Sequence, residues 1–165
     1  MNYQHLIIEG ADGTGKSTLA KRFESVGFHY IHADKPTTSS WTKEYVEPVH
    51  ALSKVKKHIV MDRWHIGEIV WPTLFNRRSI FASMNDYDAC CEMLYDAGCL
   101  AIIVVRSANG IESELLKRGE HKQVDLVIKS QQLFVDVALK TWAMDTLIID
   151  SNYLHEIGEP WKLLF

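Results

Sequence analysis

The residues with the clearest chemical potential lie in the stretch IIEGADGTGKSTLAKRF, from Ile7 to Phe23. Gly10 is followed, after four residues, by Gly15-Lys16-Ser17, which satisfies the pattern G-x-x-x-x-G-K-[ST]. Glycines in such a loop let successive backbone N–H groups point inward, and the helix that follows adds its positive dipole end. The lysine would reach the β- and γ-phosphates, and the serine hydroxyl would bind Mg²⁺. The stretch therefore predicts a loop that binds a nucleoside triphosphate.

A second stretch, IVMDRWHIGEIVW, joins an apolar run to two charged residues. Asp62 ends the run, so in a parallel sheet it would lie at the same edge as the phosphate loop, where an aspartate can hold Mg²⁺ directly or through water. Arg63 has a planar fork suited to a second phosphate or to the charge that develops during transfer. Two other interpretations stay open: Asp62 as a helix N-cap, and Arg63 in a surface ion pair.

The elements that must position these residues alternate along the chain. Five short apolar runs are predicted strands, and continuous apolar runs of this kind are typical of strands buried on both faces. The strands are expected at 5–9, 28–33, 58–62, 100–105 and 146–150, and helices at 16–25, 42–54, 86–97, 110–117 and 123–142. This alternation predicts an α/β fold: a three-layer P-loop sandwich with a five-stranded parallel sheet flanked by helices.

Composition narrows the functional classes. Hydrophobic residues make up 47% and charged residues 24% of the 165 residues, a profile typical of a soluble globular protein of one domain. The net charge of −3 argues against nucleic acid as a partner. We read no signal peptide and no membrane span, and the three cysteines are expected to be reduced core thiols. We therefore expect a cytoplasmic protein without a membrane partner.

These motifs together resemble a known family. EGADGTGKST (9–18) with DRW (62–64) is similar to the thymidylate kinase-like branch of the P-loop nucleotide kinases, and to small phage-type deoxynucleotide kinases within it. DKPTT (34–38) resembles the family's loop beside the acceptor, and LLKRGEHKQVD (115–125) resembles its basic lid. LIIDSN (147–152) is similar to the last strand and the loop that flanks the adenine.

The resemblance implies a single kinase domain over residues 1–165, with a lid at about 107–123. It implies transfer of the ATP γ-phosphoryl group to a deoxynucleoside 5′-monophosphate with a pyrimidine base, such as dTMP or dUMP. ATP with Mg²⁺ would contact Gly10, Ala11, Asp12, Gly13, Thr14, Gly15, Lys16, Ser17 and Thr18. Lys16, Asp62, Arg63 and Arg118 would be catalytic, and Ser17 and Asp62 would hold the metal. Lys117 and Lys122 could share the task of Arg118 in the lid.

The acceptor side departs from the family. The chain is short between Asp34 and His58, and the segment 41–57 contains no arginine to read a thymine. Trp41 and Tyr45 could stack on a base or simply pack on the core. One of Arg77 and Arg78 is expected to meet the acceptor, and Arg78 is assigned to it. The expected acceptor residues are Asp12, Pro36, Arg63, Trp64, Glu68, Trp71 and Arg78.

Three other functions stay open. A deoxynucleoside kinase would phosphorylate a hydroxyl and would need a base, for which Asp62 or Glu9, with His65 behind them, are the candidates. That family more often has Glu-Arg-Ser where this chain has Asp-Arg-Trp. A polynucleotide kinase would need a more basic surface, and a regulatory nucleotide-binding subunit would have no use for Asp62, Arg63 and Arg118. A helix rich in apolar residues, expected over 66–71, leaves room for a homodimer.

Overall fold

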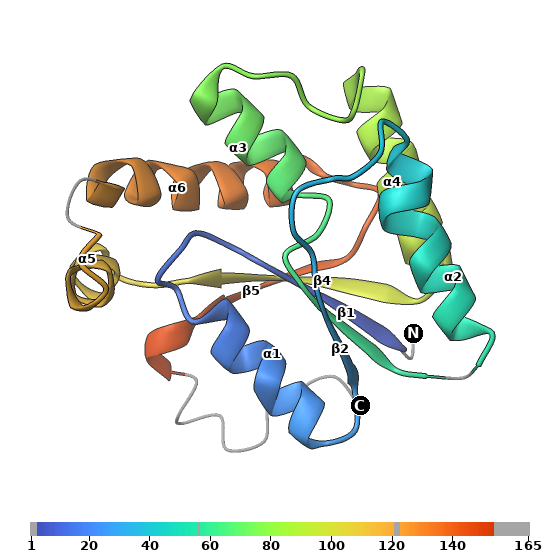
Figure 1. The fold of residues 1–165 in the computed structure, drawn as a ribbon, viewed down its shortest axis with the longest axis horizontal. Helices are drawn as coiled ribbons and strands as arrows, with labels where there is room; N and C mark the ends of the chain where they lie inside the picture. The colour runs from blue at the N-terminus through green and yellow to red at the C-terminus, as the bar shows by residue number, and fades with distance from the viewer. Residues whose placement is uncertain (1–2, 56, 121–122, 154–165) are drawn as a thin grey trace.

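The fold is built on a parallel sheet of five strands (Figure 1). The structure is a computed structural model that describes residues 3–55, 57–120 and 123–153. The strands are β1 (His5–Glu9), β2 (His29–His32), β3 (Ile59–Asp62), β4 (Cys99–Val105) and β5 (Thr146–Asp150), in the order β2-β3-β1-β4-β5. All five predicted strands are confirmed, with ends that differ by at most one residue.

Register brings the chemically important strand ends to one edge of the sheet. β1 lies in the centre, with β3 on one side and β4 on the other. Ile8 is opposite Asp62, and Glu9 is opposite Ile103. Because all strands run in the same direction, the phosphate loop after β1 and the segment after β3 leave the sheet side by side.

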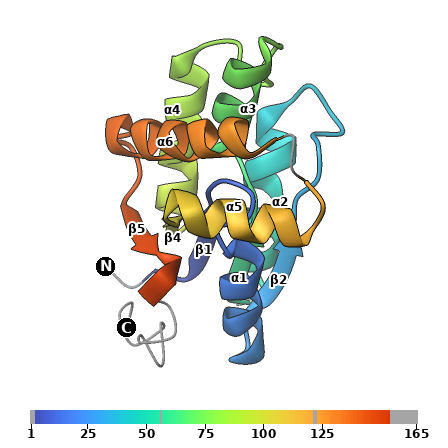
Figure 2. The ribbon, with the colours of Figure 1, turned by 90° about the vertical axis from the view of Figure 1, so that its left-hand side faces the viewer.

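Helices cover both faces of the sheet. The helical segments are α1 (Lys16–Ser25), the π-helical η1 (Thr42–Val46), α2 (Glu47–Ser53), α3 (Gly67–Phe75), α4 (Met84–Asp96), α5 (Ala108–Lys117), α6 (Val124–Lys140) and the 3₁₀ turn η3 (Ser151–Tyr153). Figure 1 shows α1 on one side of the sheet and α3, α4 and α6 on the other, and Figure 2 shows α5 lying between α6 and α1. In the described part of the chain no helix is both long and apolar enough to cross a membrane.

Alternation along the strands divides the core into two clusters. Successive side chains of a strand point to opposite faces. Leu6 and Ile8 therefore pack with Leu19 and Phe23 of α1, whereas Ile7 packs with residues of α3, α4 and α6. The three cysteines are buried with free thiols, as expected.

Two proline residues explain where the helices differ from the prediction. The segment expected as one helix over 42–54 is a π-helical turn followed by α2, because Pro48 has no N–H and its ring would clash with the carbonyl of Glu44 in a regular α-helix. α3, which was expected only over 66–71, continues to Phe75 and contains Pro72. The carbonyl of Glu68, which Pro72 cannot satisfy, instead accepts a hydrogen bond from the Ser79 hydroxyl at 2.5 Å.

The first glycine of the phosphate loop is required by close packing against β4. Gly10 has φ of 141°, and a Cβ added there would lie 2.3 Å from the carbonyl oxygen of Val104. No side chain fits between these backbones without moving one of them. Gly27, between α1 and β2, also has a positive φ of 105°, but a Cβ there would meet nothing within 4 Å.

We expect Gly10→Ala to lower the free energy of unfolding more than Gly27→Ala does. Both substitutions impose a backbone strain of about 1–2 kcal/mol, and only the first adds a clash worth a further ~1–3 kcal/mol. Urea denaturation of the two variants and the wild type measures the difference. Equal losses would mean that the β1–β4 packing at Gly10 is looser than described.

Candidate functional site

The phosphate loop has the geometry that its glycines predict. Gly13 and Gly15 take φ values of 78° and 97°, and α1 begins immediately after Gly15. The Thr14 hydroxyl donates to the carbonyl of Ala11 at 2.8 Å, which holds the loop curved. The loop therefore leads directly into the N-terminus of α1, where N–H groups without helical partners can bind an anion.

Three charged side chains form a chain across the loop. Lys16 is 6% exposed, donates from Nζ to the carbonyl of Ala11 at 2.6 Å, and lies 3.7 Å from Oδ1 of Asp12. The same oxygen accepts a hydrogen bond from Nη2 of Arg63 at 3.1 Å. Burial lowers the pKa of Lys16, and the neighbouring Asp12 carboxylate opposes that shift. Asp12 thus connects the phosphate loop to the residue after β3.

Arg63 is held in a strained backbone conformation. Its φ of 65° is in the left-handed region, which residues other than glycine rarely adopt. Its N–H donates to the carbonyl of Ile8 at 3.0 Å, so the turn is fixed to the central strand. Strain of this kind, of order 1–3 kcal/mol, is typical of functional sites.

The two acidic residues at this edge serve opposite faces of the sheet. Glu9 follows Ile7 in alternation and points to the face covered by α3, whereas Asp62 follows Val60 and points to the face covered by α1. Both side chains are buried. One carboxylate is therefore available to each side of the phosphate loop.

Glu9 fixes the start of α3. Its Oε1 accepts hydrogen bonds from the backbone N–H groups of Trp64 at 2.7 Å and Gly67 at 3.1 Å. Burial raises the pKa of Glu9 to about 7, although these two hydrogen bonds and the charge of Lys16 act in the other direction. A carboxyl with a pKa near neutrality beside a cavity can exchange a proton at working pH.

Asp62 keeps one oxygen available. Its Oδ2 accepts hydrogen bonds from the Tyr30 hydroxyl at 3.0 Å and from Nδ1 of His32 at 3.3 Å. Its Oδ1 is buried and has no hydrogen-bond partner among the described residues. A buried carboxylate oxygen without a partner is costly unless a ligand or water completes it.

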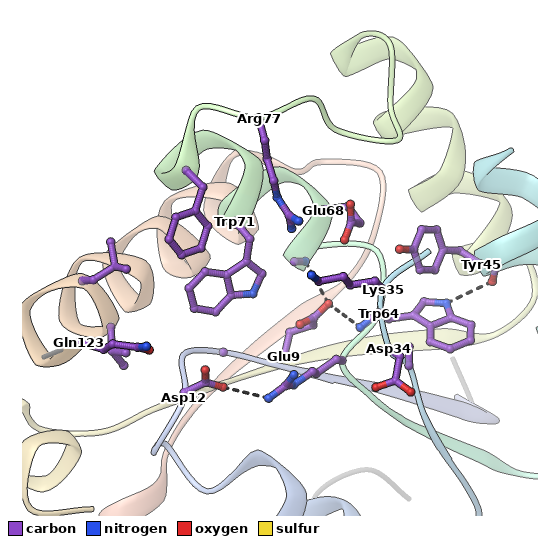
Figure 3. Close-up of a pocket in the computed structure, with 17 residues that line it drawn as sticks. Glu9, Asp12, Asp34, Lys35, Tyr45, Trp64, Glu68, Trp71, Arg77 and Gln123 are labelled. Atoms are coloured by element: carbon purple, nitrogen blue, oxygen red, sulfur yellow. Dashed lines mark hydrogen bonds and ion pairs between the residues drawn. The ribbon is translucent and has the colours of Figure 1, made fainter. Parts of the chain in front are cut away.

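A cavity of about 520 Å³ opens beside the phosphate loop on the α3 face. Its walls come from the loop, from the end of β2, from α3 and from the first turn of α6, as Figure 3 shows. Glu9, Asp12, Lys35, Glu68, Trp71 and Arg77 line it and are labelled in Figure 3; Arg63, Trp64, Phe75 and Gln123 are also among the lining residues. Trp71 stacks on Phe75, with ring centroids 6.1 Å apart, and so presents an aromatic wall.

The structure places the two adjacent arginines differently with respect to the cavity. Arg77 lines the cavity and Arg78 does not. The reason is the turn after α3, where Asn76 has a φ of 47° and Ser79 is bonded back to the carbonyl of Glu68. This turn folds the chain over the start of α3 and points Arg77 inward (Figure 3).

The cavity also contains most of the other residues that the sequence assigns to the acceptor. Asp12, Arg63, Trp64, Glu68 and Trp71 line it. Pro36 does not line it; its neighbours Asp34 and Lys35 do. Burial raises the pKa of Glu68, and the nearby charge of Arg77 acts in the other direction.

His65 belongs to the core and not to the cavity. Its side chain is fully buried, stacks on Tyr87 and lies with Nε2 3.3 Å from Sγ of Cys91. Burial lowers its pKa to about 3, so it is neutral and unsuited to proton transfer at the site. Tyr45, by contrast, lines the cavity although it is buried and packed against Trp64.

Between the phosphate loop and α5 lies an arginine that the sequence analysis missed. Arg106, directly after β4, donates from Nη1 to the carbonyl of Gly13 at 3.1 Å. Its other neighbour is Glu114 of α5, whose carboxylate lies 3.9 Å from Arg106 and 3.0 Å from Arg118. Arg118 is therefore tied to Glu114 within hydrogen-bond reach, and Lys122 lies outside the described residues.

Arg106 could have been found by its position at the carboxyl end of a buried strand, the same feature that identified Asp62. Both are the charged residues that end or directly follow a buried strand of the sheet, at the edge where the phosphate loop lies. Gln131 of α6 clamps Arg106 by accepting from its N–H at 2.8 Å and donating to its carbonyl at 3.0 Å. The pairing with Gln131 had no signal in the sequence.

Solved structures of other proteins share this fold. The chain is similar to the YorR protein from Bacillus subtilis, solved in complex with phosphorylated GDP, with a TM-score of 0.77 and 19% identity over 97% of this chain and 94% of that one. It is also similar to deoxyadenosine kinase from M. mycoides with bound dCTP, with a TM-score of 0.55 and 16% identity over 96% of each chain. For thymidylate kinase from Candida albicans the TM-score is 0.52 and the identity 17%, over 99% of this chain and 94% of that one.

No protein-family model and no curated protein sequence matches the chain. The structural likeness nevertheless confirms the predicted fold, which is that of the P-loop nucleotide kinases. At these identities the likeness concerns the fold, and the chemistry has to be argued from the residues of this chain.

The raised pKa of Glu9 predicts a distinct pH dependence of stability. Below about pH 4.5 the carboxyl is protonated in both states; between about pH 4.5 and pH 7 only the unfolded chain loses its proton. Stability therefore falls as the pH rises through this window. Relative to Glu9→Gln, which cannot ionise, the wild type should lose about 3 kcal/mol between pH 4.5 and pH 7.

Urea denaturation of both proteins at a series of pH values measures this difference. Every other titratable group, including the buried histidines, is present in both proteins. Its contribution therefore cancels in the difference between their free energies of unfolding. Glu112→Gln, at an exposed position on α5, is the matched control and should give no such pH-dependent difference. A constant difference between the wild type and Glu9→Gln would contradict the burial of an ionisable group at this position.

Proposed function

We propose that this protein transfers the γ-phosphoryl group of ATP to a deoxynucleoside 5′-monophosphate. One observation carries the proposal: the cavity beside the phosphate loop has Arg63 at its mouth, bonded through Asp12 to the loop that would hold the donor. A guanidinium in that position can bind an acceptor phosphate next to the donor phosphates. Lys35 and Arg77 add positive charge to the same cavity.

The donor would be held by the phosphate loop and the start of α1. Backbone N–H groups from Gly13 to Thr18 would surround the β- and γ-phosphates, and Lys16 would exchange its bond to the Ala11 carbonyl for a phosphate oxygen. Arg106 and Arg118 lie on the lid side, where Glu114 now compensates their charge. They are the groups best placed to stabilise charge on the transferring phosphoryl group.

The residues present fit a magnesium ion bound to ATP. Mg²⁺ prefers oxygen ligands, and the Ser17 hydroxyl is exposed in the first turn of α1 while Oδ1 of Asp62 is buried without a partner in the described residues. Such an ion would neutralise negative charge on the β- and γ-phosphates. Ser17 and Asp62 are the residues that we assign to it.

The phosphoryl transfer requires little acid or base catalysis from the protein. A phosphate oxygen of the acceptor forms the new bond to the γ-phosphorus, the bond from that phosphorus to the β–γ bridging oxygen breaks, and ADP leaves with the electron pair. Because the attacking oxygen is already anionic, no strong base is needed. The demand is on position: Arg63 would hold the acceptor phosphate in line, and Asp12 would hold Arg63.

We assign a pyrimidine base to the acceptor because of the resemblance to thymidylate kinases. The base would lie beside the indole of Trp71, whose rear is supported by Phe134 at a centroid distance of 5.9 Å. Glu68 and Arg77, an acceptor and a donor of hydrogen bonds, line the same cavity near Trp71 (Figure 3). They are the groups best placed to contact its polar edge.

A second function, phosphorylation of a nucleoside hydroxyl, is favoured by one specific feature. Glu9 lines the cavity with a pKa of about 7, which suits a general base for a neutral hydroxyl. Asp62, the other candidate base, points to the opposite face. In this reaction Glu9 would take the hydroxyl proton while the oxygen attacks the γ-phosphorus.

A coupled assay of ADP release distinguishes the two functions. With ATP and Mg²⁺, the protein is offered nucleosides and nucleoside monophosphates in parallel. We expect turnover with dTMP or dUMP, and a loss of about 100-fold in kcat/KM for Arg63→Ala, since a charged hydrogen bond is worth roughly 1.5–3 kcal/mol and a guanidinium beside the transferring group lies at the upper end of that range. Lys140→Ala, which removes one exposed positive charge at the end of α6, is the control.

Turnover with nucleosides alone would replace the monophosphate reaction by hydroxyl phosphorylation, and Glu9→Gln should then abolish it. Absence of turnover with every acceptor, in a protein that still binds ATP, would reject both reactions.

The placement of Arg77 gives a separate prediction about the acceptor. Arg77→Ala should raise the KM for the acceptor by about 10-fold or more, with little change in the KM for ATP, because a charged hydrogen bond is worth roughly 1.5–3 kcal/mol. Arg78→Ala should raise the acceptor KM less. Steady-state kinetics with each substrate varied in turn measure both, and a larger effect of Arg78 would restore the assignment made from the sequence.

A further inference from the structure

The carboxylate of Asp62 is held by two side chains of the neighbouring strand. Tyr30 and His32 lie two residues apart on β2, so both point to the α1 face of the sheet, where Asp62 also points. The Tyr30 hydroxyl and Nδ1 of His32 both donate to Oδ2, at 3.0 and 3.3 Å. Register brings them there, because His32 is directly opposite Asp62 in the β2–β3 ladder.

Both donors bind the same oxygen of the Asp62 carboxylate. Oδ2 receives both hydrogen bonds, and Oδ1 receives none from the described residues although Asp62 is 0% exposed. Lys16 of the phosphate loop is close enough for the charge of Asp62 to act on its pKa. The carboxylate therefore has one oxygen fixed to the sheet and the other left for a group that arrives with the triphosphate.

The donors are well suited to a fixed orientation. A phenolic hydroxyl keeps its proton throughout the physiological range, so the Tyr30 hydroxyl acts as a donor to Asp62. His32 lies between two acids, with Nδ1 3.3 Å from Oδ2 of Asp62 and Nε2 3.9 Å from Oδ1 of Asp34. Because a carboxylate oxygen only accepts hydrogen bonds, Nδ1 is the donor in the contact with Asp62. Neither residue lines the acceptor cavity.

We propose that Tyr30 and His32 are positioning residues for magnesium: together they turn the carboxylate of Asp62 so that Oδ1 faces the metal of the bound ATP. This inference rests on the metal site of the proposed function and adds to it the two residues that orient its buried ligand. Hydrogen-bonded supports of this kind around a metal ligand typically change metal affinity by 10–100-fold when removed.

The test measures ATP binding and not turnover. Isothermal titration calorimetry with ATP, in the presence of Mg²⁺ and in its absence with EDTA, gives the factor by which Mg²⁺ strengthens ATP binding. We expect Tyr30→Phe and His32→Leu each to reduce this factor by about 10-fold, as the loss of a hydrogen bond to a metal ligand typically does. ATP binding without Mg²⁺ should stay at the wild-type value, because neither residue contacts the phosphate loop in the structure.

Two matched variants separate orientation from packing. His32→Asn places an amide N–H where Nδ1 lies and should restore much of the Mg²⁺ factor. His29→Leu is the control, because it removes a histidine from the exposed start of the same strand. Thermal unfolding of every variant, without ligand, shows whether the fold is kept.

The outcomes are distinct. The inference is overturned if Tyr30→Phe and His32→Leu retain the wild-type Mg²⁺ factor. This conclusion holds whether or not Asp62→Asn, which alters the metal ligand itself, loses the factor. An equal loss in His29→Leu, or no recovery in His32→Asn, would also overturn it in favour of a general effect on β2. If the expected pattern appears in a protein that phosphorylates no nucleotide or nucleoside, the proposed function fails while the positioning of Asp62 stands.

Discussion

The hydrogen bonds from the backbone N–H groups of Trp64 and Gly67 to the carboxylate of Glu9 hold the two halves of the site together. Glu9 ends β1, directly before the phosphate loop, and the two N–H groups lie in the turn and first residue that lead into α3. The wall of the acceptor cavity is therefore attached to the strand that carries the donor loop. Burial raises the pKa of this carboxyl group to about 7, so a group that ionises near neutral pH lies at the junction.

The sheet also separates two carboxylates by placing them on opposite faces. Alternation sends Glu9 to the face covered by α3 and Asp62 to the face covered by α1. Two carboxylates that are close in the sheet thus meet different surroundings: backbone N–H groups and a cavity in one case, Tyr30 and His32 in the other. Different environments allow similar side chains to take different roles, here the anchoring of α3 and, in the proposed function, the binding of a metal.

Charge around the phosphate loop is compensated within the protein. Asp12 pairs with Lys16 and Arg63 on the acceptor side, and Glu114 pairs with Arg106 and Arg118 on the lid side. Each acid neutralises two bases that would face phosphate oxygens in the proposed reaction. The arrangement keeps the basic residues in position near the loop without a ligand, and a polyanionic ligand can take over their hydrogen bonds.

The sequence by itself determined the sheet, the phosphate loop and the residue types at its edge. Continuous apolar runs, glycine spacing and the Asp62-Arg63 pair are local signals that need no knowledge of packing. Only the tertiary structure decided which side chains meet. Arg77 and not Arg78 lines the cavity because Pro72 leaves the Glu68 carbonyl to Ser79, and His65 is excluded because it is buried against Tyr87. Such outcomes depend on contacts between segments far apart in the chain, and one residue of displacement in a turn reverses the direction of a side chain.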